Sequence, residues 1–286
     1  MQSEMGDSDP YRRVSRTMTR TVIYLILVGG AITMVVPFIW MISTALKTNL
    51  EVFTFPPTFM PEEPQWNNFT DIFEIVPYGR WFLNSIFITL VQTSLYLFVA
   101  SLAAFVFARL QFPGRDTIFM LYLATLMIPG EVTLIPKFIL MKELHLIDTY
   151  PAVILPGVFN AYGVFLLRQF FLTLPESLEE AAILDGASYF RIYRSIILPL
   201  SGPGLATLAI FAFMGAWNDF LWPLIVINTD IMKPLSVGLS SFHGLYETNW
   251  PYLMAASTLA LVPIVVVFVF AQKYFVEGIA LTGVKG

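Results

Sequence analysis

The sequence predicts an all-α integral membrane protein with six transmembrane helices. Of its 286 residues, 57% are hydrophobic and only 13% are charged, and the mean hydropathy is +0.71. Soluble domains carry about 25% charged residues, so this composition indicates a polytopic membrane protein. Six apolar segments are long enough to cross the about 30 Å hydrocarbon core of a bilayer. They cover residues 21–46, 81–107, 116–135, 151–172, 203–227 and 250–275.

The chain begins with a polar segment, residues 1–20, that precedes the apolar residues 21–46. A positively charged start before an apolar run is also typical of a signal peptide. The apolar region of a signal peptide has only about 7–15 residues, and residues 21–46 exceed that length. We therefore expect an uncleaved first transmembrane helix whose N-terminal segment stays in the cytoplasm.

The segments expected outside the cell are small. Residues 47–80 carry the prolines Pro56, Pro57, Pro61 and Pro64, which predict an extended extracytoplasmic loop. The third span is interrupted by Pro129, Gly130 and Glu131, so we expect its outer end to be irregular. Residues 137–148 have the pattern of a short amphipathic helix at the membrane interface. No separate soluble domain is predicted.

The distribution of lysine and arginine predicts the orientation of the chain. With the N-terminus in the cytoplasm, the cytoplasmic basic residues outnumber the external ones, as the positive-inside rule requires. The cytoplasmic set is Arg12, Arg13, Arg16, Arg20, Arg109, Arg115, Arg168, Arg191, Arg194, Lys273 and Lys285. The external set is Lys47, Arg80, Lys137, Lys142 and Lys233. Residues 173–202 and the C-terminal tail, residues 276–286, are then cytoplasmic.

Several function classes are disfavoured by the composition. The net charge of −4 and the lack of a basic face argue against nucleic acid as a partner. The chain has no cysteine, and its two histidines, His145 and His243, fall in different outer loops, so we expect no metal site. The terminal GIALTGVKG lacks the strand, helix and glycine–lysine spacing of a phosphate-binding loop. If ATP is used, another chain hydrolyses it.

Residues 173–202 bring polar groups into an otherwise apolar sequence. Ser177 and Glu180 have the spacing of a capping box, and a helix is predicted from there to Gly186, a natural residue after a helix end. A second helix is predicted over residues 188–198, with Pro199 ending it. The pattern alone leaves two alternatives: an amphipathic pair resting on the membrane, or a docking element for a soluble partner.

The same stretch resembles the EAA loop of ABC-importer permeases. That motif is Glu-Ala-Ala, three residues, Gly, nine residues and then Ile-x-Leu-Pro, and the chain keeps every interval between Glu180 and Pro199. The resemblance extends to Ala216–Asp219, the LLRQFF run at residues 166–171, and the terminal GVKG. It covers most of the chain and is closest in length to the maltose-type permeases of carbohydrate uptake.

The resemblance implies a type I ABC-importer permease fold with a cytoplasmic EAA coupling helix. It implies a five-helix core over residues 81–275, with the coupling loop at 173–202. The residues implied to couple to the ATPase are Glu180, Ala181, Ala182, Asp185, Gly186, Ile196, Leu198 and Pro199. The tail residues implied to reach toward the ATPase are Gly283, Lys285 and Gly286.

The resemblance also implies the partners and the cellular location. The chain would be a multi-pass protein of the cytoplasmic (inner) membrane with both termini in the cytoplasm. It would act with a second homologous permease, two ABC ATPase subunits, an extracytoplasmic solute-binding protein and the lipid bilayer. It would be a transport subunit and not an enzyme. The chain would hold no cofactor, because ATP and Mg²⁺ bind to the ATPase.

Polar residues inside the spans are the candidates for contact with the transported solute. Asn218 and Asp219 lie about 22 Å into the fifth span, at 1.5 Å per residue, and Trp217 could stack on a sugar ring. Asp219 could equally pair with a polar group across the bundle, and Glu131 could line an outer gate or be solvated. The full set is Trp217, Asn218, Asp219, Glu131, Asn160 and Tyr162, with Asn84 and Gln92 as weaker candidates.

The transported solute is expected to be a sugar, an oligosaccharide or a related polyol. The alternative is glycerol phosphate or another non-sugar solute, but a phosphate would favour lysine or arginine within the spans and none is evident there. A channel or secondary transporter that works alone is a third class. The chain shows no inverted pair of interrupted spans, which weakens that hypothesis.

Overall fold

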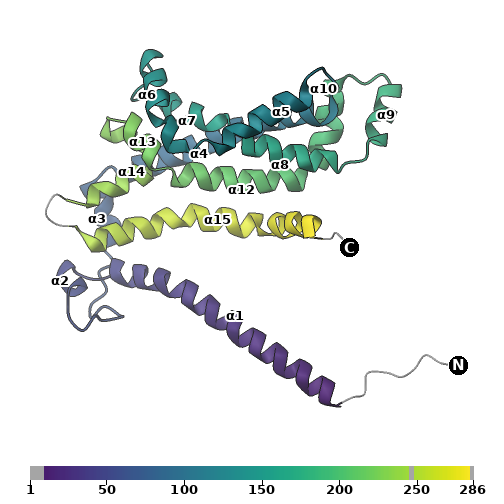
Figure 1. Cartoon of the computed structure of the whole chain (residues 1–286). Helices are drawn as coiled ribbons and strands as arrows, with labels where there is room; N and C mark the ends of the chain where they lie inside the picture. The colour runs from purple at the N-terminus through teal and green to yellow at the C-terminus, as the bar shows by residue number, and fades with distance from the viewer. Residues whose placement is uncertain (1–9, 245–247, 284–286) are drawn as a thin grey trace.

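Helices form almost all of the regular structure in the described part of the chain, residues 10–244 and 248–283 of the computed structural model (Figure 1). Side chains are described for residues 17–244 and 248–272. Within these ranges strand-like pairing occurs only at one isolated bridge, between His243 and Thr248. The predicted all-α class is confirmed.

Three helices are long and apolar enough to cross a membrane without a break. They are α1 (Pro10–Ala45), α4 (Tyr78–Arg109) and α15 (Trp250–Gly283). They agree with the first, second and sixth predicted spans, although α1 begins about three turns earlier. Because α15 continues to Gly283, most of the segment expected as a tail is helical.

Three more spans are pairs of helices bent at a short break. In the first pair, one half is α5 (Arg115–Ala124) followed by the 3₁₀ turn η1 (Thr125–Met127). The other half is the 3₁₀ turn η2 (Gly130–Thr133) followed by α6 (Leu134–Glu143), and the two halves meet at 96°. The second bends by 42° between α7 (Tyr150–Val158) and α8 (Ala161–Leu172). The third bends by 78° where the segment Tyr189–Leu200 meets α12 (Gly202–Asn218).

The breaks have local causes in the sequence. Ile128 is extended, with φ −86° and ψ 116°, because the residue before a proline is pushed out of the α-helical region. Asn160 is also extended, and its side-chain oxygen accepts a hydrogen bond from the amide of Tyr162 at 2.9 Å. This N-cap begins α8 as a new helix rather than a continuation of α7.

Three predicted boundaries are wrong in detail. The outer loop, residues 47–80, is not simply extended, because it holds α2 (Asn49–Val52) and α3 (Asn68–Ile75). The interfacial helix predicted over residues 137–148 begins one turn earlier as α6 and ends at Glu143. The fifth span, predicted to continue to residue 227, ends at Asn218.

The fifth span is followed by a run of short elements instead of a continuous helix. Asp219 is extended and ends α12. The elements that follow are α13 (Leu221–Val226), η4 (Asp230–Met232), α14 (Leu235–Leu239) and η5 (Ser240–Phe242). They connect α12 to α15 across one end of the bundle.

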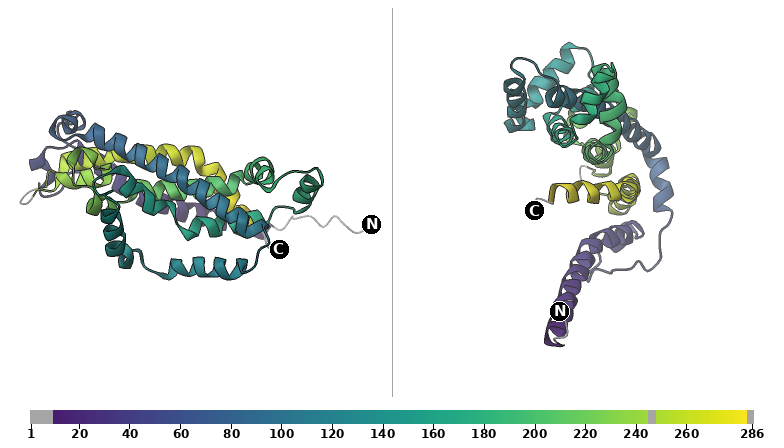
Figure 2. Two further views of the ribbon diagram at one scale, coloured as in Figure 1. Left: turned by 90° about the horizontal axis from the view of Figure 1, so that it is seen from above. Right: turned by 90° about the vertical axis from the view of Figure 1, so that its right-hand side faces the viewer.

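The spans run side by side, and the short elements gather at the two ends. Figures 1 and 2 show α2, α3, α6, α13 and α14 at one end, while the beginning of α1 and the end of α15 lie at the other end. The helix α9 (Ser177–Leu184) lies at that second end as well. The first helix, α1, diverges from the bundle, and none of its most apolar stretch is buried. The chain therefore presents a long apolar helix to its surroundings.

Buried side chains form clusters toward the two ends of the bundle. We call one the inner cluster; it joins α4, α8 and α12 to the 173–202 loop. It is built on Tyr96, Ala100, Phe105, Val164, Leu167, Phe171, Ile192, Tyr193, Ile197 and Leu208. An outer cluster joins α4, α7 and α13 around Ile88, Val153 and Trp222. A third cluster packs Tyr78, Trp81 and Trp217 against α14 and α15.

Candidate functional site

The first helix of the EAA loop ends where the sequence predicted. α9 is followed by Gly186 in the left-handed conformation, with φ +77°. The amide of Gly186 donates to the carbonyl of Ile183 and that of Ala187 to Ala182, both at 2.9 Å. This is the Schellman arrangement that satisfies the last carbonyls of a helix. A Cβ at Gly186 would meet no atom within 4 Å, so glycine is needed for the backbone angle and not for space.

The capping box predicted for this helix is absent. α9 begins at Ser177 after Glu176, which has a helical backbone conformation and makes no side-chain cap. A capping residue needs a non-helical backbone to direct its side chain at the free amides, and here the chain is already turning at Glu176. The acidic residue that makes a specific contact is Glu179 instead.

The second arm of the loop is one continuous but irregular helical segment. It consists of α10 (Tyr189–Ile192), the π-helical turn η3 (Tyr193–Ile197) and α11 (Leu198–Leu200). Ser188 caps α10, since its hydroxyl accepts from the amide of Arg191 at 3.4 Å. Pro199 was predicted to end this helix but lies in its last turn.

The π-helical turn accommodates Pro199. Proline has no amide hydrogen to donate to the carbonyl four residues earlier, and the amide of Leu198 instead reaches back five residues to Tyr193. The chain turns only at Ser201. In this segment Tyr193 and Ile197 are buried, whereas Phe190 is exposed.

The coupling residues implied by the resemblance divide into two groups in the structure. α9 projects from the end of the bundle (Figure 1), and none of its eight described residues is buried. Glu180, Ala181, Asp185 and Gly186 are exposed. The remaining four are Ala182, Ile196, Leu198 and Pro199. The first three are partly buried against the inner cluster, and Pro199 follows Leu198 in the same helical segment.

α9 also exposes apolar side chains away from the bundle. Leu184 is 89% exposed, and Ile183 and Leu178 are about half exposed. A short helix that carries both exposed leucines and exposed acidic groups is suited to insertion into a cleft of another protein. The docking alternative left open by the sequence pattern stays a prediction.

The loop is held to α4 at two points. The guanidinium of Arg109, the last residue of α4, donates to the carbonyls of Phe171 at 2.6 Å and Leu174 at 2.8 Å. Its Nε lies 2.8 Å from Oε1 of Glu179 in an ion pair. About two turns earlier in α4, the hydroxyl of Ser101 is hydrogen-bonded to the hydroxyl of Tyr193 at 2.8 Å. Both arms of the loop therefore rest on one helix.

The ion pair at Glu179 lies in a partly desolvated setting. Burial raises the pKa of Glu179 above its ordinary value, and the nearby Arg109 guanidinium opposes that rise. Glu176 adds to it by charge repulsion. Arg109 is only 3% exposed in its side chain, whereas Glu176 is 81% exposed at 3.6 Å from Arg109. Of these two carboxylates, Glu179 is therefore the one that interacts more strongly with Arg109.

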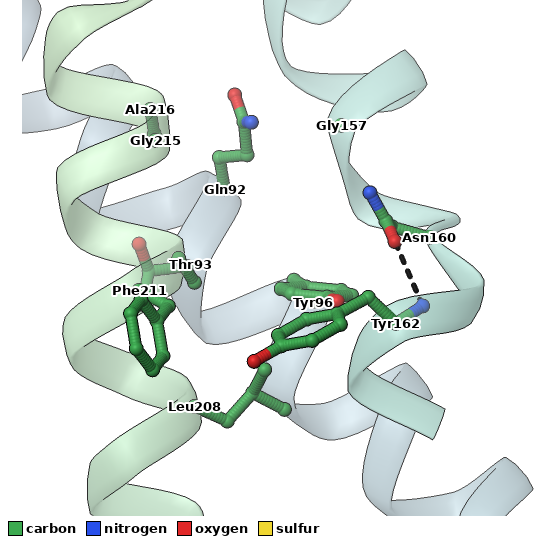
Figure 3. Close-up of a pocket in the computed structure, with 11 residues that line it drawn as sticks. Gln92, Thr93, Tyr96, Gly157, Asn160, Tyr162, Leu208, Phe211, Gly215 and Ala216 are labelled. Carbon is green, nitrogen blue, oxygen red and sulfur yellow. Dashed lines mark hydrogen bonds between the residues drawn. The ribbon is translucent and has the colours of Figure 1, made fainter. Parts of the chain in front are cut away.

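A cavity of about 250 Å³ lies between α4, α12 and the break between α7 and α8 (Figure 3). Ligand pockets span about 300–1,000 Å³, so this space suits a small part of a solute. None of the described residues that line it carries a charge. The lining is Gln92, Thr93, Tyr96, Gly157, Asn160, Tyr162, Leu208, Phe211, Ala212, Gly215 and Ala216.

The cavity combines hydroxyl and amide groups with aromatic faces. Figure 3 shows the rings of Tyr96 and Tyr162 between the helices. The oxygen of Tyr96 accepts from the amide of Gly163 at 2.7 Å, which leaves its hydroxyl proton free to donate. The ring of Tyr162 meets Phe211 edge-on at 6.3 Å. The hydroxyl of Thr93 is buried with no hydrogen-bond partner among the described residues.

Two glycines give this cavity its polar walls. A Cβ at Gly157 would lie 2.0 Å from the amide nitrogen of Gln92, and one at Gly163 would lie 2.4 Å from the hydroxyl of Tyr96. Each glycine lets a polar side chain of α4 lie against the backbone of α7 or α8. Asn160, Tyr162 and the weaker candidate Gln92 are therefore brought together, as a binding site would require.

Trp217 lies outside the cavity. Its side chain is buried in the third cluster, where the ring stacks on Phe213 at 5.9 Å and meets Phe82 edge-on. Its indole nitrogen donates to the carbonyl of Ala260 at 3.3 Å. The ring faces and the donor are engaged inside the fold, so the structure gives Trp217 a packing position.

Asn218 and Asp219 lie at the outer end of α12 rather than in mid-span. Asn218 donates to the carbonyl of Met214 at 2.9 Å, within its own helix. A carboxylate oxygen of Asp219 lies 3.5 Å from the amide of Trp222. This is the local turn contact expected of an aspartate that ends one helix and begins another. Glu131 lies in η2, exposed and apart from the cavity.

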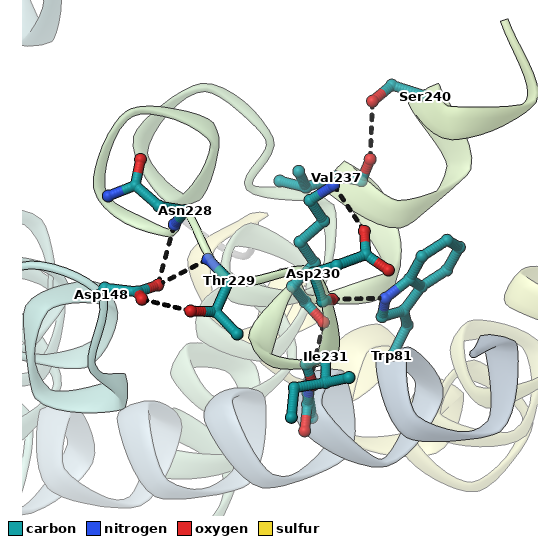
Figure 4. Close-up of polar contacts among 10 residues, drawn as sticks. Trp81, Asp148, Asn228, Thr229, Asp230, Ile231, Val237 and Ser240 are labelled. Atoms are coloured by element: carbon teal, nitrogen blue, oxygen red, sulfur yellow. Dashed lines mark hydrogen bonds and ion pairs between the residues drawn. The ribbon is translucent and has the colours of Figure 1, made fainter. Parts of the chain in front are cut away.

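Asn84 belongs to a network of polar contacts at the outer end; Figure 4 shows the part of it around Trp81 and Asp148. Its side-chain nitrogen donates to the carbonyls of Ile231 at 2.8 Å and Lys233 at 2.9 Å. The indole of Trp81 donates to the carbonyl of Asp230 at 2.8 Å. Asp148 accepts from the amides of Asn228 at 2.8 Å and Thr229 at 2.9 Å. These bonds fasten the 219–242 segment to α4 and to the start of α7.

The remaining predicted residues are at the C-terminus. Gly283 is the last residue of α15, and Lys285 and Gly286 lie outside the described residues. Their predicted proximity to an ATPase stays a prediction.

Sequence reasoning missed Arg109, Thr93 and Tyr96. Arg109 entered only as a cytoplasmic charge, because its partners are 62 to 70 positions away and only folding brings them together. Thr93 and Tyr96 follow Gln92 on one side of α4 at helical spacing. That pattern of polar groups inside an apolar span was a usable signal.

Comparison with known families and structures gives concordant matches. Residues 96–280 match the family described as "Binding-protein-dependent transport system inner membrane component". The chain is 42% identical over 229 residues to the arabinooligosaccharides transport system permease protein AraQ of Halalkalibacterium halodurans, which covers 80% of this chain and 82% of that protein. It is 34% identical over 264 residues to the sn-glycerol-3-phosphate transport system permease protein UgpE of Pectobacterium atrosepticum, with 90% and 94% covered.

A solved structure shares the fold. It is the crystal structure of a bacterial ABC transporter involved in the import of the acidic polysaccharide alginate, with a TM-score of 0.80 over 95% of this chain and 100% of the matched chain. The sequence identity is 21%, so this likeness concerns the fold alone.

Proposed function

Because the chain belongs to the family of binding-protein-dependent transport system inner membrane components, we propose that it forms half of the translocation pathway for a sugar, oligosaccharide or related polyol. Its fold is that of ABC-importer permeases, as the EAA resemblance implied. The observation that carries the proposal is the uncharged cavity, whose hydroxyl, amide and aromatic groups match the surface of a saccharide.

The proposed complex contains four kinds of chain. This permease subunit would pair with a second homologous permease, two ABC ATPase subunits and an extracytoplasmic binding protein. ATP and Mg²⁺ would bind to the ATPase subunits. The exposed coupling residues of α9, from Glu180 to Gly186, would occupy a cleft of the ATPase.

The orientation is proposed from two observations. The beginning of α1, the end of α15 and the exposed α9 lie at the same end of the molecule (Figure 1). Basic residues are concentrated in the segments assigned to that end, which favours the cytoplasmic side. The chain is an inner-membrane protein; its N-terminus, C-terminus and EAA loop are proposed to face the cytoplasm.

Solute contact is proposed for Asn160, Tyr162 and the cavity residues of α4. A sugar hydroxyl could accept from the free hydroxyl proton of Tyr96 and donate to the unpaired oxygen of Thr93. The rings of Tyr162 and Phe211 offer apolar faces to the C–H groups of a sugar. Asn218, Asp219 and Glu131 would line the outer part of the route rather than this cavity.

A glycerol phosphate importer is the second candidate, because a relative at 34% identity is named for that solute. A phosphate is commonly bound by arginine, lysine or a helix N-terminus. The cavity offers no cation among its described lining residues. The uncharged lining therefore favours a neutral, hydroxyl-rich solute.

Uptake by reconstituted complex tests the proposal. The complex purified through a tagged copy of this chain is placed in vesicles with ATP inside, and radiolabelled arabino-oligosaccharide or glycerol 3-phosphate is added with binding protein outside. ATP-dependent uptake of the neutral sugar alone is expected. Uptake of only the phosphate ester would favour the second candidate. Uptake by this chain without an ATPase would indicate an independent channel or secondary transporter and overturn the proposal.

One pair of variants tests the cavity in the same assay. Tyr162→Leu removes the aromatic ring but keeps an apolar side chain, and sugar uptake is expected to fall. Tyr24→Leu is the matched control, because Tyr24 lies exposed on α1, away from the cavity. Equal uptake by both variants would exclude the Tyr162 ring from solute contact.

A further inference from the structure

We propose that Arg109 is the positioning residue that makes the EAA loop and the cavity walls a single moving unit. The proposal rests on the coupling role given to the loop above. The EAA motif contains neither Arg109 nor its partner Glu179. The feature that carries the proposal is the set of contacts made by one almost fully buried guanidinium at the cytoplasmic end of α4.

The guanidinium joins three elements. Arg109 itself ends α4. Its Nη2 donates to the carbonyls of Phe171 and Leu174, just where α8 ends and the EAA loop begins. Its Nε lies 2.8 Å from Oε1 of Glu179 in the first turn of α9, an ion pair whose geometry is not that of a hydrogen bond. A cation is favoured beside the free carbonyls of a helix C-terminus, so the arginine stabilises the end of α8 while holding α9 in place.

The same side of α4 holds the other arm of the loop. Ser101, Phe105 and Arg109 are spaced four residues apart and therefore lie along one side of the helix. Ser101 is hydrogen-bonded to Tyr193, and the ring of Phe105 lies 5.3 Å from the ring of Tyr193. This stripe of α4 contacts both arms of the loop, with the charged contact at its tip.

The two helices held by Arg109 also form walls of the cavity. α4 contributes Gln92, Thr93 and Tyr96, and α8 with its N-cap contributes Asn160 and Tyr162. Tyr96 lies about 20 Å from Arg109 along α4, at 1.5 Å per residue. A rigid helix transmits a displacement over that distance. Movement of α9 is thus delivered to two walls of the cavity together.

The ion pair between Arg109 and Glu179 is the contact between α4 and α9 that a single substitution most easily removes. Without it, the charged contact left at the start of α9 would be the longer, exposed one between Arg109 and Glu176 at 3.6 Å. The apolar contacts of this part of the loop are those of the partly buried Ala182 in α9 and Ala187 just after it. Removing one partner of a buried ion pair leaves the other uncompensated. An ATPase could then move α9 without moving α4, and ATP hydrolysis would continue while transport falls.

Uncoupling of ATP hydrolysis from uptake tests the proposal. Glu179→Gln is the primary variant, because it keeps the shape of the side chain and leaves the bonds of Arg109 to the two carbonyls. Arg109→Gln is the second. Each is measured as the intact complex in vesicles for sugar uptake, for ATPase rate and for the amount of ATPase that co-purifies. The expected result is a loss of uptake of about tenfold, equivalent to about 1.4 kcal/mol, with an assembled and active ATPase.

Two controls separate this role from a structural one. Asp116→Asn removes a carboxylate that is 71% exposed beside Arg115 and Arg168 at the same end of the molecule, and normal coupling is expected. The double variant Glu179→Gln/Arg109→Gln should lose no more uptake than Arg109→Gln alone, since both changes break one link.

The outcomes are distinct from failure of the proposed function. Normal uptake per ATP in Glu179→Gln and Arg109→Gln would overturn the role of Arg109 while the unmodified complex still imports sugar. Loss of complex assembly together with uptake would also overturn it, because the residues would then serve only folding. Failure of the unmodified complex to couple uptake to ATP would instead overturn the proposed function.

Discussion

The two ends of the molecule are built in opposite ways. At the outer end, at least six hydrogen bonds centred on Trp81, Asn84 and Asp148 join the 219–242 segment to α4 and to the start of α7; Figure 4 shows those of Trp81 and Asp148. At the inner end, α9 projects from the bundle with no buried residue among those described. Its charged contacts with α4 all go to Arg109, at 2.8 Å from Glu179 and at 3.6 Å from Glu176, which precedes the helix. We call the outer end, which is closed by contacts within this chain, the outer cap; α9 at the inner end is the part that we propose is held by another protein.

The end of α9 depends on the backbone conformation of Gly186, and substituting this glycine should have the largest effect on transport. Gly186→Val places a β-branched residue at φ +77°, where a side chain costs about 1–2 kcal/mol or more, and the Schellman end of α9 is expected to open. Sugar uptake by the complex should be lost and the co-purified ATPase reduced. Gly186→Asn is the matched control, because asparagine adopts the left-handed conformation more readily. Equal loss in both variants would show that the angle is not the reason for glycine.

The closed outer cap should be sensitive to added volume. A Cβ at Gly238 would lie 2.2 Å from the ring of Trp81, which is fully buried and hydrogen-bonded to Asp230. The free energy of unfolding of Gly238→Ala is expected to fall by about 1–3 kcal/mol, the usual cost of overpacking. Thermal unfolding of the protein in detergent measures it.

Gly79→Ala is the control at the same end. Its Cβ would meet Phe73 at an ordinary 3.7 Å, and alanine is the better helix former. We expect a melting temperature at or above that of the unmodified chain. A larger loss in Gly79→Ala than in Gly238→Ala would contradict the packing described at this end.

The second attachment of the inner loop can be removed without touching α9. Ser101→Ala leaves the buried hydroxyl of Tyr193 without its partner, which costs about 1–3 kcal/mol. Ser101→Ala/Tyr193→Phe removes both partners and should recover most of that stability. The comparison is made by thermal unfolding of the two variants. Equal destabilisation by the single and double variants would mean that the hydrogen bond between Ser101 and Tyr193 contributes little.

The smallest expected effect is a dependence of the outer cap on pH. Hydrogen bonds from the Thr229 hydroxyl and amide hold the pKa of Asp148 below its ordinary value. A carboxylate with a lowered pKa stabilises the fold above the unfolded value of about 3.9 and loses this as the pH falls through the folded value. At pH 7 the free energy of unfolding of the unmodified chain should exceed that of Asp148→Asn by about 1 kcal/mol, a modest difference because the site is partly exposed.

The free energy of unfolding of the unmodified chain and of Asp148→Asn is measured at pH 7 and near pH 3.5. The difference in this free energy between the two proteins should be smaller at the lower pH. A constant difference would show that the charge of Asp148 does not carry the stabilisation.

The elements that sequence alone predicted are those with local causes. The straight spans follow from long apolar runs, and the end of α9 follows from Gly186. The break after Ile128 follows from Pro129. The end of α12 at Asn218 was missed because the apolar pattern continues past it to residue 227. The turn is held by contacts that the pattern does not show: the Ser236 hydroxyl donates to the carbonyl of Asp219, and the Leu235 amide donates to Ser85 of α4.

The candidate site was predicted in part for the same reason. Asn160 and Tyr162 were found because polar residues in a span are rare and conspicuous. Trp217 was chosen by residue type, but its neighbours Phe213 and Phe82 hold it inside the fold. Arg109 was not chosen at all, since a charge at the end of a span is ordinary until its partners from α8 and α9 are known.

The central claim is that the EAA loop and α4 move as one unit during the transport cycle. The chain has no cysteine, so spin labels can be placed at Gln111→Cys after α4 and Ser177→Cys in α9, both exposed. The distance between the labels is measured in the intact complex without nucleotide and with ATP trapped. The account predicts one narrow distribution that is the same in both states and broadens in Glu179→Gln. A shift between the two states in the otherwise unmodified complex would contradict it.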